Sequence, residues 1–373
     1  MALGIRGEFY MAKRLIIVLL FSLTVLLFSS ISIHAIYVET EVRGDFFIKN
    51  VVINGERIEN YNLQYSIVTL DDVMYIPLTG EMCEIYGIKA EMNWESRVLA
   101  IEKVDATRKN ISQDWFKNDA KPLTLSVIHD SKIIVNSYDE YDLIYDRIEE
   151  SKALKRKSEE VDLKGQPLLH ADKHIYIPLR AIAESEAFNW NLFFNGYYGL
   201  CLSTDQGVPA RNFLDEREML ENQGLVNYIM HINKTIPPSY GQQLVFLFKR
   251  AGEVYGVDPK LVMAMAHRES RFNNGSISKN GATGIMQIMP ATGARYGLTQ
   301  EQLLDPKTSI DFGTMYISER IAAYDGDLIL ALSAYNQGST RVNRGTYSSV
   351  FANSVLTAYD GINRYLETNG YIL

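Results

Sequence analysis

The pattern of apolar and polar residues changes about halfway along the 373-residue chain. Residues 45–205 carry short runs rich in Ile, Val, Tyr and Phe, separated by turn residues, which is typical of strands. From Gly241 to the end, apolar residues recur with the 3.6-residue period of amphipathic helices. We therefore expect a multidomain α+β chain, with a β-rich domain over residues 45–205 and an all-α domain over residues 241–373.

Two stretches of the β-rich half echo each other. Val73–Leu78 matches His174–Leu179, and each is followed by a helix-like stretch, a Trp and another apolar run. The pattern predicts a duplicated strand–helix–strand unit, in which a Pro ends the first strand because it cannot donate to the ladder. Asn54-Gly55 lies between two apolar runs and predicts a hairpin turn. Residues 147–160 carry charges of both signs and predict a solvated helix or loop.

The residues that follow the two matching stretches resemble the pattern of a known family. The second copy continues as PLRAIAE, whereas the first has diverged to PLTGEMC. Together with the Trp that follows each copy, residues 45–205 resemble the copper amine oxidase N-terminal-like (stalk) domain. The resemblance implies a non-catalytic domain that binds no copper and is common on exported proteins. Such a stalk would be a spacer, or would contact the cell wall or another envelope protein.

Helical spacing begins in a connector between the two halves. Residues 206–240 form this connector, in which Leu214–His231 predicts a helix that Pro237-Pro238 should end. Asp258 followed by Pro259 predicts an N-cap and the first residue of a later helix. Further helices are expected near residues 308–324, 327–335 and 350–368.

Residues 1–36 predict export. Leu15–Phe28 is an almost unbroken apolar run, preceded by Lys13 and Arg14 and followed by small residues up to Ala35. This pattern is typical of a secretory signal peptide. The run also approaches the roughly 20 residues that cross a bilayer as a helix, so an N-terminal membrane anchor stays open. In both cases the remainder would act outside the cytoplasm, either secreted to the cell wall or held on the outer face of the membrane.

The charge distribution disfavours one class of function, and the cysteines leave two possibilities open. The formal net charge is −8, but from Gly241 onward 12 Lys and Arg accompany 11 Asp and Glu, so the helical half is nearly neutral. A nucleic-acid-binding domain usually has a basic face, which disfavours that class. Cys83 and Cys201 could form a disulfide outside the cell or remain two buried free thiols. Zinc, phosphate-loop and nucleophile-elbow motifs do not occur, and we expect neither a metal nor a cofactor.

Glu269, at the end of the helix that starts at Pro259, is a candidate general acid. It shares a helix face with Val262, Met265 and Ala266, and this face should point into the core. Desolvation there disfavours the carboxylate, and the negative end of the helix dipole disfavours it further. Both effects raise the pKa, as a general acid at neutral pH requires. Taken alone, however, a Glu at a helix end is more often a solvated surface residue.

Three motifs follow the Glu269–Phe272 segment ESRF. These are Ser278, then GIMQIMPAT from Gly284, then AYNQG from Ala334. The series resembles the soluble lytic transglycosylase catalytic domain, whose pattern is E-S-x-F, a Ser, G-[LI]-M-Q-x-M-P-x-T and A-Y-N-x-G. The match covers about residues 241–345. It implies a lysozyme-like α-helical fold with a deep groove for the glycan strands of peptidoglycan.

The resemblance also implies roles for single residues. Glu269 would be the catalytic acid and base, and Tyr335 would orient it through its hydroxyl. Ser278 would hydrogen-bond the N-acetyl region of the substrate and the surroundings of Glu269. Ser278 could instead merely cap a turn.

The remaining substrate-binding candidates lie in the same motifs. Gln287 and Met289 would line the subsite beside the scissile bond, and Asn336 would hold a loop or a sugar. Met289 could equally be a core residue. Gly284 and Gly338 are best explained by a close approach of another backbone segment.

The distribution of carboxylates suggests which reaction follows. Residues 270–300 contain no Asp or Glu, whereas glycosidases normally use two carboxylates. A single carboxylate fits the chemistry that the resemblance implies: Glu269 protonates the β-1,4 oxygen between N-acetylmuramic acid and N-acetylglucosamine, and then accepts the C6 hydroxyl proton as a 1,6-anhydro ring closes. Asp311, Glu319 or Asp325 could still fold back toward the site. A hydrolytic muramidase on the same fold and a non-catalytic wall-binding protein therefore remain alternatives.

Overall fold

The computed structural model describes residues 40–104, 123–138 and 156–372. Val42–Leu373 forms one compact unit. The expected signal peptide or membrane anchor over residues 1–36 lies outside the described residues. Within the described part, every helix is too short or too polar to cross a membrane.

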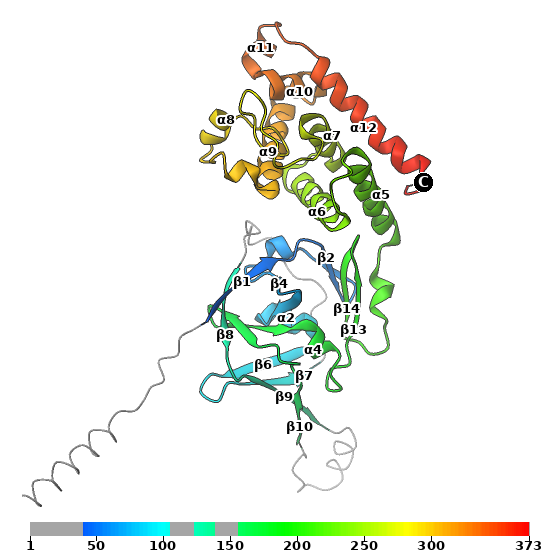
Figure 1. Ribbon diagram of the computed structural model, residues 1–373. Helices are drawn as coiled ribbons and strands as arrows, with labels where there is room; N and C mark the ends of the chain where they lie inside the picture. Colours follow the sequence, from blue (N-terminus) through cyan, green and yellow to red (C-terminus); the bar gives the residue numbers. More distant parts are fainter. Residues whose placement is uncertain (1–39, 105–122, 139–155, 373) are drawn as a thin grey trace, which may run out of the picture. The chain divides into compact units, whose positions relative to one another are not determined.

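The β-rich part is built from three sheets in the described residues (Figure 1). One closes into a barrel with the strand order β1-β4-β5-β12-β11-β8, and the others have the orders β10-β9-β7-β6 and β13-β14-β2-β3. The strands are β1 (Glu41–Phe46), β2 (Asn50–Ile53), β3 (Glu56–Ile58), β4 (Val68–Leu70), β5 (Val73–Pro77), β6 (Ile88–Asn93), β7 (Val98–Lys103), β8 (Leu123–Ile128), β9 (Lys132–Tyr138), β10 (Arg156–Val161), β11 (Leu168–Ala171), β12 (His174–Pro178), β13 (Asn191–Asn195) and β14 (Gly199–Ser203). Four short helices join them: η1 (Asn60–Asn62), α2 (Gly80–Tyr86), α4 (Leu179–Ala183) and η2 (Ala210–Phe213).

The hairpin expected at Asn54-Gly55 is confirmed. Strands β2 and β3 pair antiparallel, with Ile53 opposite Glu56. The two residues between them have φ values of 54° and 87°. A two-residue turn that matches the strand twist requires positive φ at both central positions, which Asn and Gly adopt at the lowest cost.

The proline that was expected to end a strand does so in both stretches. Strand β5 ends at Pro77 and is followed by α2 and β6, and strand β12 ends at Pro178 and is followed by α4 and β13. The two first strands pair antiparallel within the barrel, with Ile76 opposite Ile177. The second strands, β6 and β13, lie in different sheets.

The charged segment over residues 147–160 is a strand from Arg156 onward, so the expected helix or loop is wrong there. Strand β10 pairs antiparallel with β9 along its whole length. It lies at the edge of its sheet, where Glu160 is exposed to solvent as it would be on a solvated helix. Charge content alone cannot separate these two structures. Residues 147–155 lie outside the described part.

The second half is helical, as its periodicity predicts. Its elements are α5 (Glu216–Ile232), α6 (Pro238–Tyr255), α7 (Pro259–Ser270), α8 (Pro290–Ala294), η3 (Gln302–Leu304), α9 (Pro306–Ala323), α10 (Leu328–Gln337), α11 (Ser339–Asn343) and α12 (Val350–Thr368). The cap predicted for α7 is confirmed, because the Asp258 side chain accepts a hydrogen bond of 2.8 Å from the backbone N–H of Lys260. Ile277, Thr283 and Ile288 form isolated β-bridges, so a small β structure accompanies the helices.

The proline pair in the connector has a different role from the one expected. Helix α5 already ends at Ile232, and its C-cap is Asn233. Pro237 is the N-cap of α6, and Pro238 is the first residue of that helix. Proline fits the first helical position because its missing N–H would have no partner there and its φ is already helical. The pair therefore starts a helix.

Helix α7 lies in the core of the helical part. It packs against α6, α9 and α12 (Figure 1). Every residue from Leu261 to Ala266 is buried, so the helix is covered on all sides over this stretch. Outside this stretch, the first two residues, Pro259 and Lys260, and the last turn, from His267 to Ser270, are partly or fully exposed. The fold thus holds the end of α7 rigidly at the edge of a closed core.

The two cysteines are free and buried. Cys83 lies on α2 and Cys201 on β14. Of the two possibilities left open by the sequence, the pair of buried thiols is the one observed.

Candidate active site

The chain reverses direction directly after Glu269. Arg271 and Phe272 both have left-handed backbone conformations, with φ values of 53° and 62°. The Phe272 side chain is fully buried in the helical core, which stabilises this unusual conformation. The reversal ends α7 at Ser270 and places Glu269 in its last turn.

Glu269 is partly buried and has no polar partner. Among the described residues, its carboxyl group makes neither a hydrogen bond nor an ion pair. Burial raises the pKa of Glu269 from its usual 4.5 to about 8. Desolvation acts in this direction because the charged form loses its hydration. The desolvation expected from the sequence is thus present, and the effect of the helix dipole stays a prediction.

Ser270 fastens the end of α7 to the segment that carries the GIMQ motif. Its hydroxyl donates a hydrogen bond of 2.7 Å to the backbone oxygen of Ile285. It also accepts one of 3.2 Å from the backbone N–H of Asn273. Ser270 therefore fixes the distance between Glu269 and this segment. We did not single it out from the sequence, although it stands within the ESRF motif.

The Gln287 side chain stabilises the loop that carries the GIMQ motif through two hydrogen bonds to its backbone. Its side-chain N–H₂ donates to the backbone oxygens of Ser276 at 3.0 Å and Gly284 at 2.9 Å. The residue itself has a positive φ of 50°. Both protons of the amide are used in the loop, whereas its oxygen has no partner among the described residues.

The two glycines singled out from the sequence differ. Gly284 has a φ of 81°, and a Cβ added there would lie 1.9 Å from the backbone oxygen of Leu303. Close backbone approach therefore explains Gly284, as expected. At Gly338 an added Cβ would meet nothing within 4 Å, so the same explanation is wrong for that residue. Its φ of 84° and ψ of 144° at the end of α10 are the reason, because L-residues avoid this region.

Tyr335 connects α10 to the segment beside Glu269. Its hydroxyl donates a hydrogen bond of 3.0 Å to the backbone oxygen of Met286. Burial, and secondly the charge of Glu269, raise the pKa of Tyr335 well above its usual value. The two side chains are therefore within electrostatic reach of each other. The single hydroxyl proton is bound by Met286, so in this structure it does not bond to Glu269.

The structure gives the hydrogen bond of Ser278 and the burial of Met286 and Met289. The Ser278 hydroxyl accepts a hydrogen bond of 2.9 Å from the backbone N–H of Ala282, so it does cap a turn. Met286 is fully buried. Met289 is 42% exposed at the start of α8, so it is not a core residue.

Asn336 does not hold a loop in this structure. Its side chain is exposed and makes no hydrogen bond within the described residues. The neighbouring Gln337 does so instead, because it donates to the backbone oxygen of Ser348 and accepts from its N–H. The sequence analysis singled out Asn336 and gave Gln337 no role, although the two amides are neighbours in the same motif.

The three carboxylates that could have folded back are engaged elsewhere or exposed. Asp311 pairs with Arg250 and Lys307, and Glu319 pairs with Arg320. Asp325 is exposed in the turn after α9. Burial is the cause of the raised pKa of Glu269, without a contribution from a neighbouring charge. In the described part of the chain, no charged side chain therefore shifts the pKa of Glu269, and the Tyr335 hydroxyl within its electrostatic reach is neutral.

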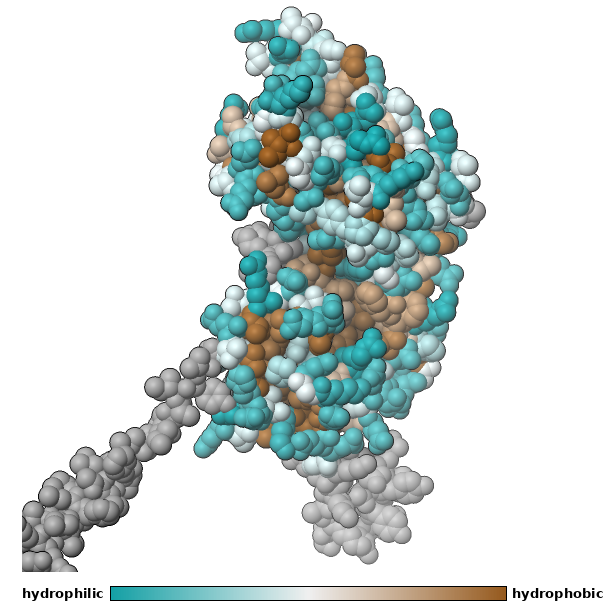
Figure 2. Space-filling view, in the orientation of Figure 1, coloured by the Kyte–Doolittle hydropathy of each residue, from teal (hydrophilic) through white to brown (hydrophobic). Residues whose placement is uncertain are grey.

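Exposed apolar side chains lie on the segment between α7 and α9. Ile277, Met289 and Tyr296 are 54%, 42% and 45% exposed. Figure 2 shows that apolar side chains on the visible face of the helical part form small patches between hydrophilic ones. Such a mixed surface suits a ligand that has both apolar faces and hydrogen-bonding groups.

The helical part is similar to known proteins. Residues 246–352 match the Transglycosylase SLT domain family. The soluble lytic murein transglycosylase of Escherichia coli K12 is 31% identical over 150 residues, which are 38% of this chain and 22% of that protein. The transglycosylase of Enterobacteria phage PRD1 is 35% identical over 106 residues, which are 28% of this chain and 39% of the phage protein.

A solved structure is also similar. The 70 kDa soluble lytic transglycosylase from Escherichia coli is 25% identical, covers 43% of this chain and 33% of its own, and has a TM-score of 0.31. The chain thus spans well under half the length of these relatives.

Proposed function

Because residues 246–352 form a transglycosylase SLT domain, we propose that this chain is a peptidoglycan lytic transglycosylase. It would cleave the β-1,4 bond between N-acetylmuramic acid and N-acetylglucosamine and leave a 1,6-anhydromuramic end. The observation that carries the proposal is the state of Glu269, a partly buried carboxyl group with a raised pKa on which no second carboxylate of the described residues acts. The names of the relatives, which include lytic murein transglycosylases, support the same activity.

In the first step Glu269 acts as an acid. With a pKa of about 8, its carboxyl group is protonated near pH 7. It donates its proton to the glycosidic oxygen as the bond from that oxygen to C1 of N-acetylmuramic acid breaks. The electron pair of the bond stays on the departing oxygen. The carbonyl oxygen of the substrate's own N-acetyl group stabilises the positive charge that develops at C1.

In the second step Glu269 acts as a base. Its carboxylate accepts the proton of the C6 hydroxyl, and the C6 oxygen bonds to C1 to close the 1,6-anhydro ring. The carboxyl group is protonated again, and no water is consumed. Hydrolytic glycosidases position a second carboxylate about 5–9.5 Å from the first to bind C1 or activate water. Among residues 40–104, 123–138 and 156–372, no second carboxylate acts on Glu269, which favours ring closure over hydrolysis.

The remaining site residues would bind the sugar. Ser278 uses an acceptor position of its hydroxyl for Ala282, so its proton stays available for the N-acetyl group. Gln287 would offer its amide oxygen, and the exposed thioether of Met289 would pack on a sugar ring. Tyr335 would act through Met286 by fixing the segment beside Glu269. Asn336 would offer to sugar hydroxyls an amide that has no hydrogen-bond partner among the described residues.

Residues 45–205 would serve as a non-catalytic stalk of the copper amine oxidase N-terminal-like kind. The equal order of β5-α2-β6 and β12-α4-β13 supports a duplicated unit. The domain limits would be those expected from the sequence, with residues 206–240 as a connector and 241–373 as the catalytic domain. Export through residues 1–36 would bring the enzyme to its substrate outside the cytoplasm, where the stalk would contact the wall or another envelope protein.

Product analysis tests the proposal. Purified peptidoglycan is digested with the wild-type chain and with Glu269→Gln, and the muropeptides are analysed by mass spectrometry. We expect anhydromuramic ends from the wild type and none from the variant. Glu367→Gln, which changes an exposed side chain on α12, is the matched control and should leave the products unchanged. Reducing muramic ends would show a hydrolase, and intact peptidoglycan with the wild type would contradict the proposed activity and favour a non-catalytic wall-binding protein.

A further inference from the structure

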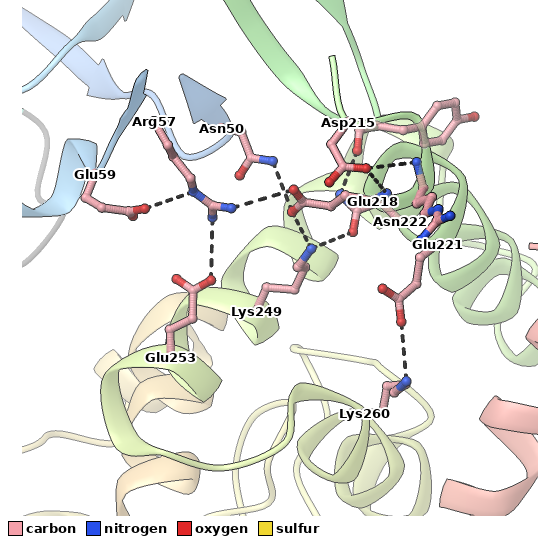
Figure 3. A network of polar contacts seen from close by, with 12 residues as sticks. Asn50, Arg57, Glu59, Asp215, Glu218, Glu221, Asn222, Lys249, Glu253 and Lys260 are labelled. Carbon is pink, nitrogen blue, oxygen red and sulfur yellow. Dashed lines mark hydrogen bonds and ion pairs between the residues drawn. The ribbon is translucent and has the colours of Figure 1, made fainter. Parts of the chain in front are cut away.

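A dense set of polar contacts joins the β-rich part to helices α5 and α6 (Figure 3). At its centre is the Glu218 carboxylate on α5, whose side chain is only 16% exposed. It accepts a hydrogen bond of 3.1 Å from Asn50 on β2 and pairs with Arg57 on β3 at 3.6 Å. Lys249 on α6 pairs with the same carboxylate at 2.5 Å. One half-buried anion therefore binds groups from both sheet strands and both helices.

Arg57 extends this contact to a second carboxylate on α6. Its guanidinium lies 2.9 Å from Glu59 within the β-rich part and 3.5 Å from Glu253 on α6. The guanidinium can bind several carboxylates at once because it presents five donors in a planar fork. Figure 3 shows it between Glu59, Glu218 and Glu253.

Two more contacts flank the central one. Lys49 donates hydrogen bonds of 2.9 Å to the Gln242 side chain on α6 and to the backbone oxygen of Gly196. The Gly196 backbone lies so close to α6 that an added Cβ would be 2.8 Å from the Gln242 amide. The Arg250 guanidinium of α6 stacks over the Tyr61 ring at 4.3 Å. Arg250 also pairs with Asp311, which ties the contact to α9.

The two surfaces are closely packed as well as bonded. The cavity left between them has a volume of about 30 Å³ and is lined by Tyr61 and Ile58 on one side and Phe246 and Arg250 on the other. A space of this size holds one or two water molecules at most. We call the whole contact the junction, and its members are Lys49, Asn50, Arg57, Tyr61, Glu218, Gln242, Lys249, Arg250 and Glu253.

We infer that the β-rich part docks rigidly on α5 and α6 through the junction, so that the two parts move and unfold as one unit. A freely moving spacer would leave Glu218, Lys249 and Arg250 facing solvent. Here the partners come from both sides, and breaking the contact would leave half-buried charges without their full set of partners. Such a loss costs more than the loss of an exposed ion pair. The inference is independent of the proposed activity, because none of the junction residues belongs to the candidate active site.

The first test measures rigidity in the intact chain. Spin labels are attached at Glu95→Cys in the β6–β7 turn and Glu367→Cys on α12, both exposed positions, while the native Cys83 and Cys201 are buried. Electron-electron resonance should give one narrow distance distribution. A broad distribution in the otherwise wild-type chain would overturn the inference without any junction variant.

The second test measures cooperativity by calorimetry. The wild-type chain should unfold in a single transition. Lys49→Ala with Arg57→Ala should lower the Tm by about 3 °C or more, or split the transition in two. The matched control combines Lys89→Ala and Arg43→Ala, which removes the same residue types from exposed positions on strands β6 and β1 that do not belong to the junction, and should shift the Tm by less than about 1 °C. Two transitions in the wild type, or equal shifts in both double variants, would contradict a rigid junction.

Discussion

The Glu269→Gln substitution should stabilise the protein at alkaline pH while it removes activity. The Gln side chain keeps the shape of Glu but never carries a charge. In the folded protein the Glu269 carboxyl has no hydrogen bond or ion pair with the described residues, and its pKa is about 8. An ionised carboxylate at this position is therefore an unpaired, largely desolvated charge, which opposes folding.

The pH range of this effect follows from the two pKa values. Below about pH 4.5 the carboxyl group is protonated in both the folded and the unfolded chain, so it has no pH-dependent effect. Between pH 4.5 and about 8 the unfolded chain has released the proton and the folded chain still holds it, so the free energy of unfolding falls. Above the pKa of Glu269 in the folded protein, the decrease in the free energy of unfolding is complete. A tenfold change in proton affinity is worth about 1.4 kcal/mol, so the full loss is about 5 kcal/mol.

Urea unfolding of the wild type and of Glu269→Gln at pH 4 and pH 9 measures this directly. We expect the two chains to differ by less than about 1 kcal/mol at pH 4, and the variant to be more stable by up to about 5 kcal/mol at pH 9. Glu367→Gln controls for the loss of a solvated carboxylate and should show no such dependence on pH. If Glu269→Gln were equally stable or less stable than the wild type at pH 9, the carboxyl group would not be desolvated and the proposed acid would lose its physical basis.

Three further predictions concern the same site. Cleavage should decline as the pH rises through the Glu269 pKa of about 8, because the acid form is lost, and an unchanged rate at pH 10 would contradict this. Gly284→Ala should destabilise the protein by more than about 2 kcal/mol in urea unfolding, because its Cβ would lie 1.9 Å from a backbone oxygen. Gly297→Ala, with a φ of 77° and open space, should cost only about 1 kcal/mol. Tyr335→Phe should lose its bond to Met286 and lower the cleavage rate about tenfold, with far-UV circular dichroism unchanged, and full activity would show that the bond is dispensable.

Features that depend on neighbouring residues were predictable from the sequence. The Asn54-Gly55 turn and the Asp258 cap are examples, because backbone conformation and capping involve only a few adjacent residues. The same holds for the proline that ends β5 and β12. Strand β10 and the start of α6 at Pro238 were missed. A charged edge strand and a charged helix have the same composition, and a proline pair can end one helix or begin the next.

In the candidate site, too, some features were predictable from the sequence and others depend on the folded path of the chain. The apolar helix face predicts the burial of Glu269, because periodicity determines which side chains point into the core. The hydrogen bonds of Ser270 and Tyr335 to backbone oxygens were not predictable. Backbone acceptors carry no sequence signal, since every residue has one. Only the folded path of the loop decides that Met286 offers its oxygen to Tyr335.

Within the part of the chain that the structure describes, Glu269 has no charged partner, and this is itself part of the proposed mechanism. A single group that first donates and then accepts a proton works best when its pKa lies near the working pH. A nearby Arg or Lys would favour the carboxylate, lower the pKa and leave no proton to donate. A nearby carboxylate would keep the proton in place and could also activate water, which would open a route to hydrolysis. Burial without a charged neighbour raises the pKa and provides no second base, and the structure combines these two conditions at the end of α7.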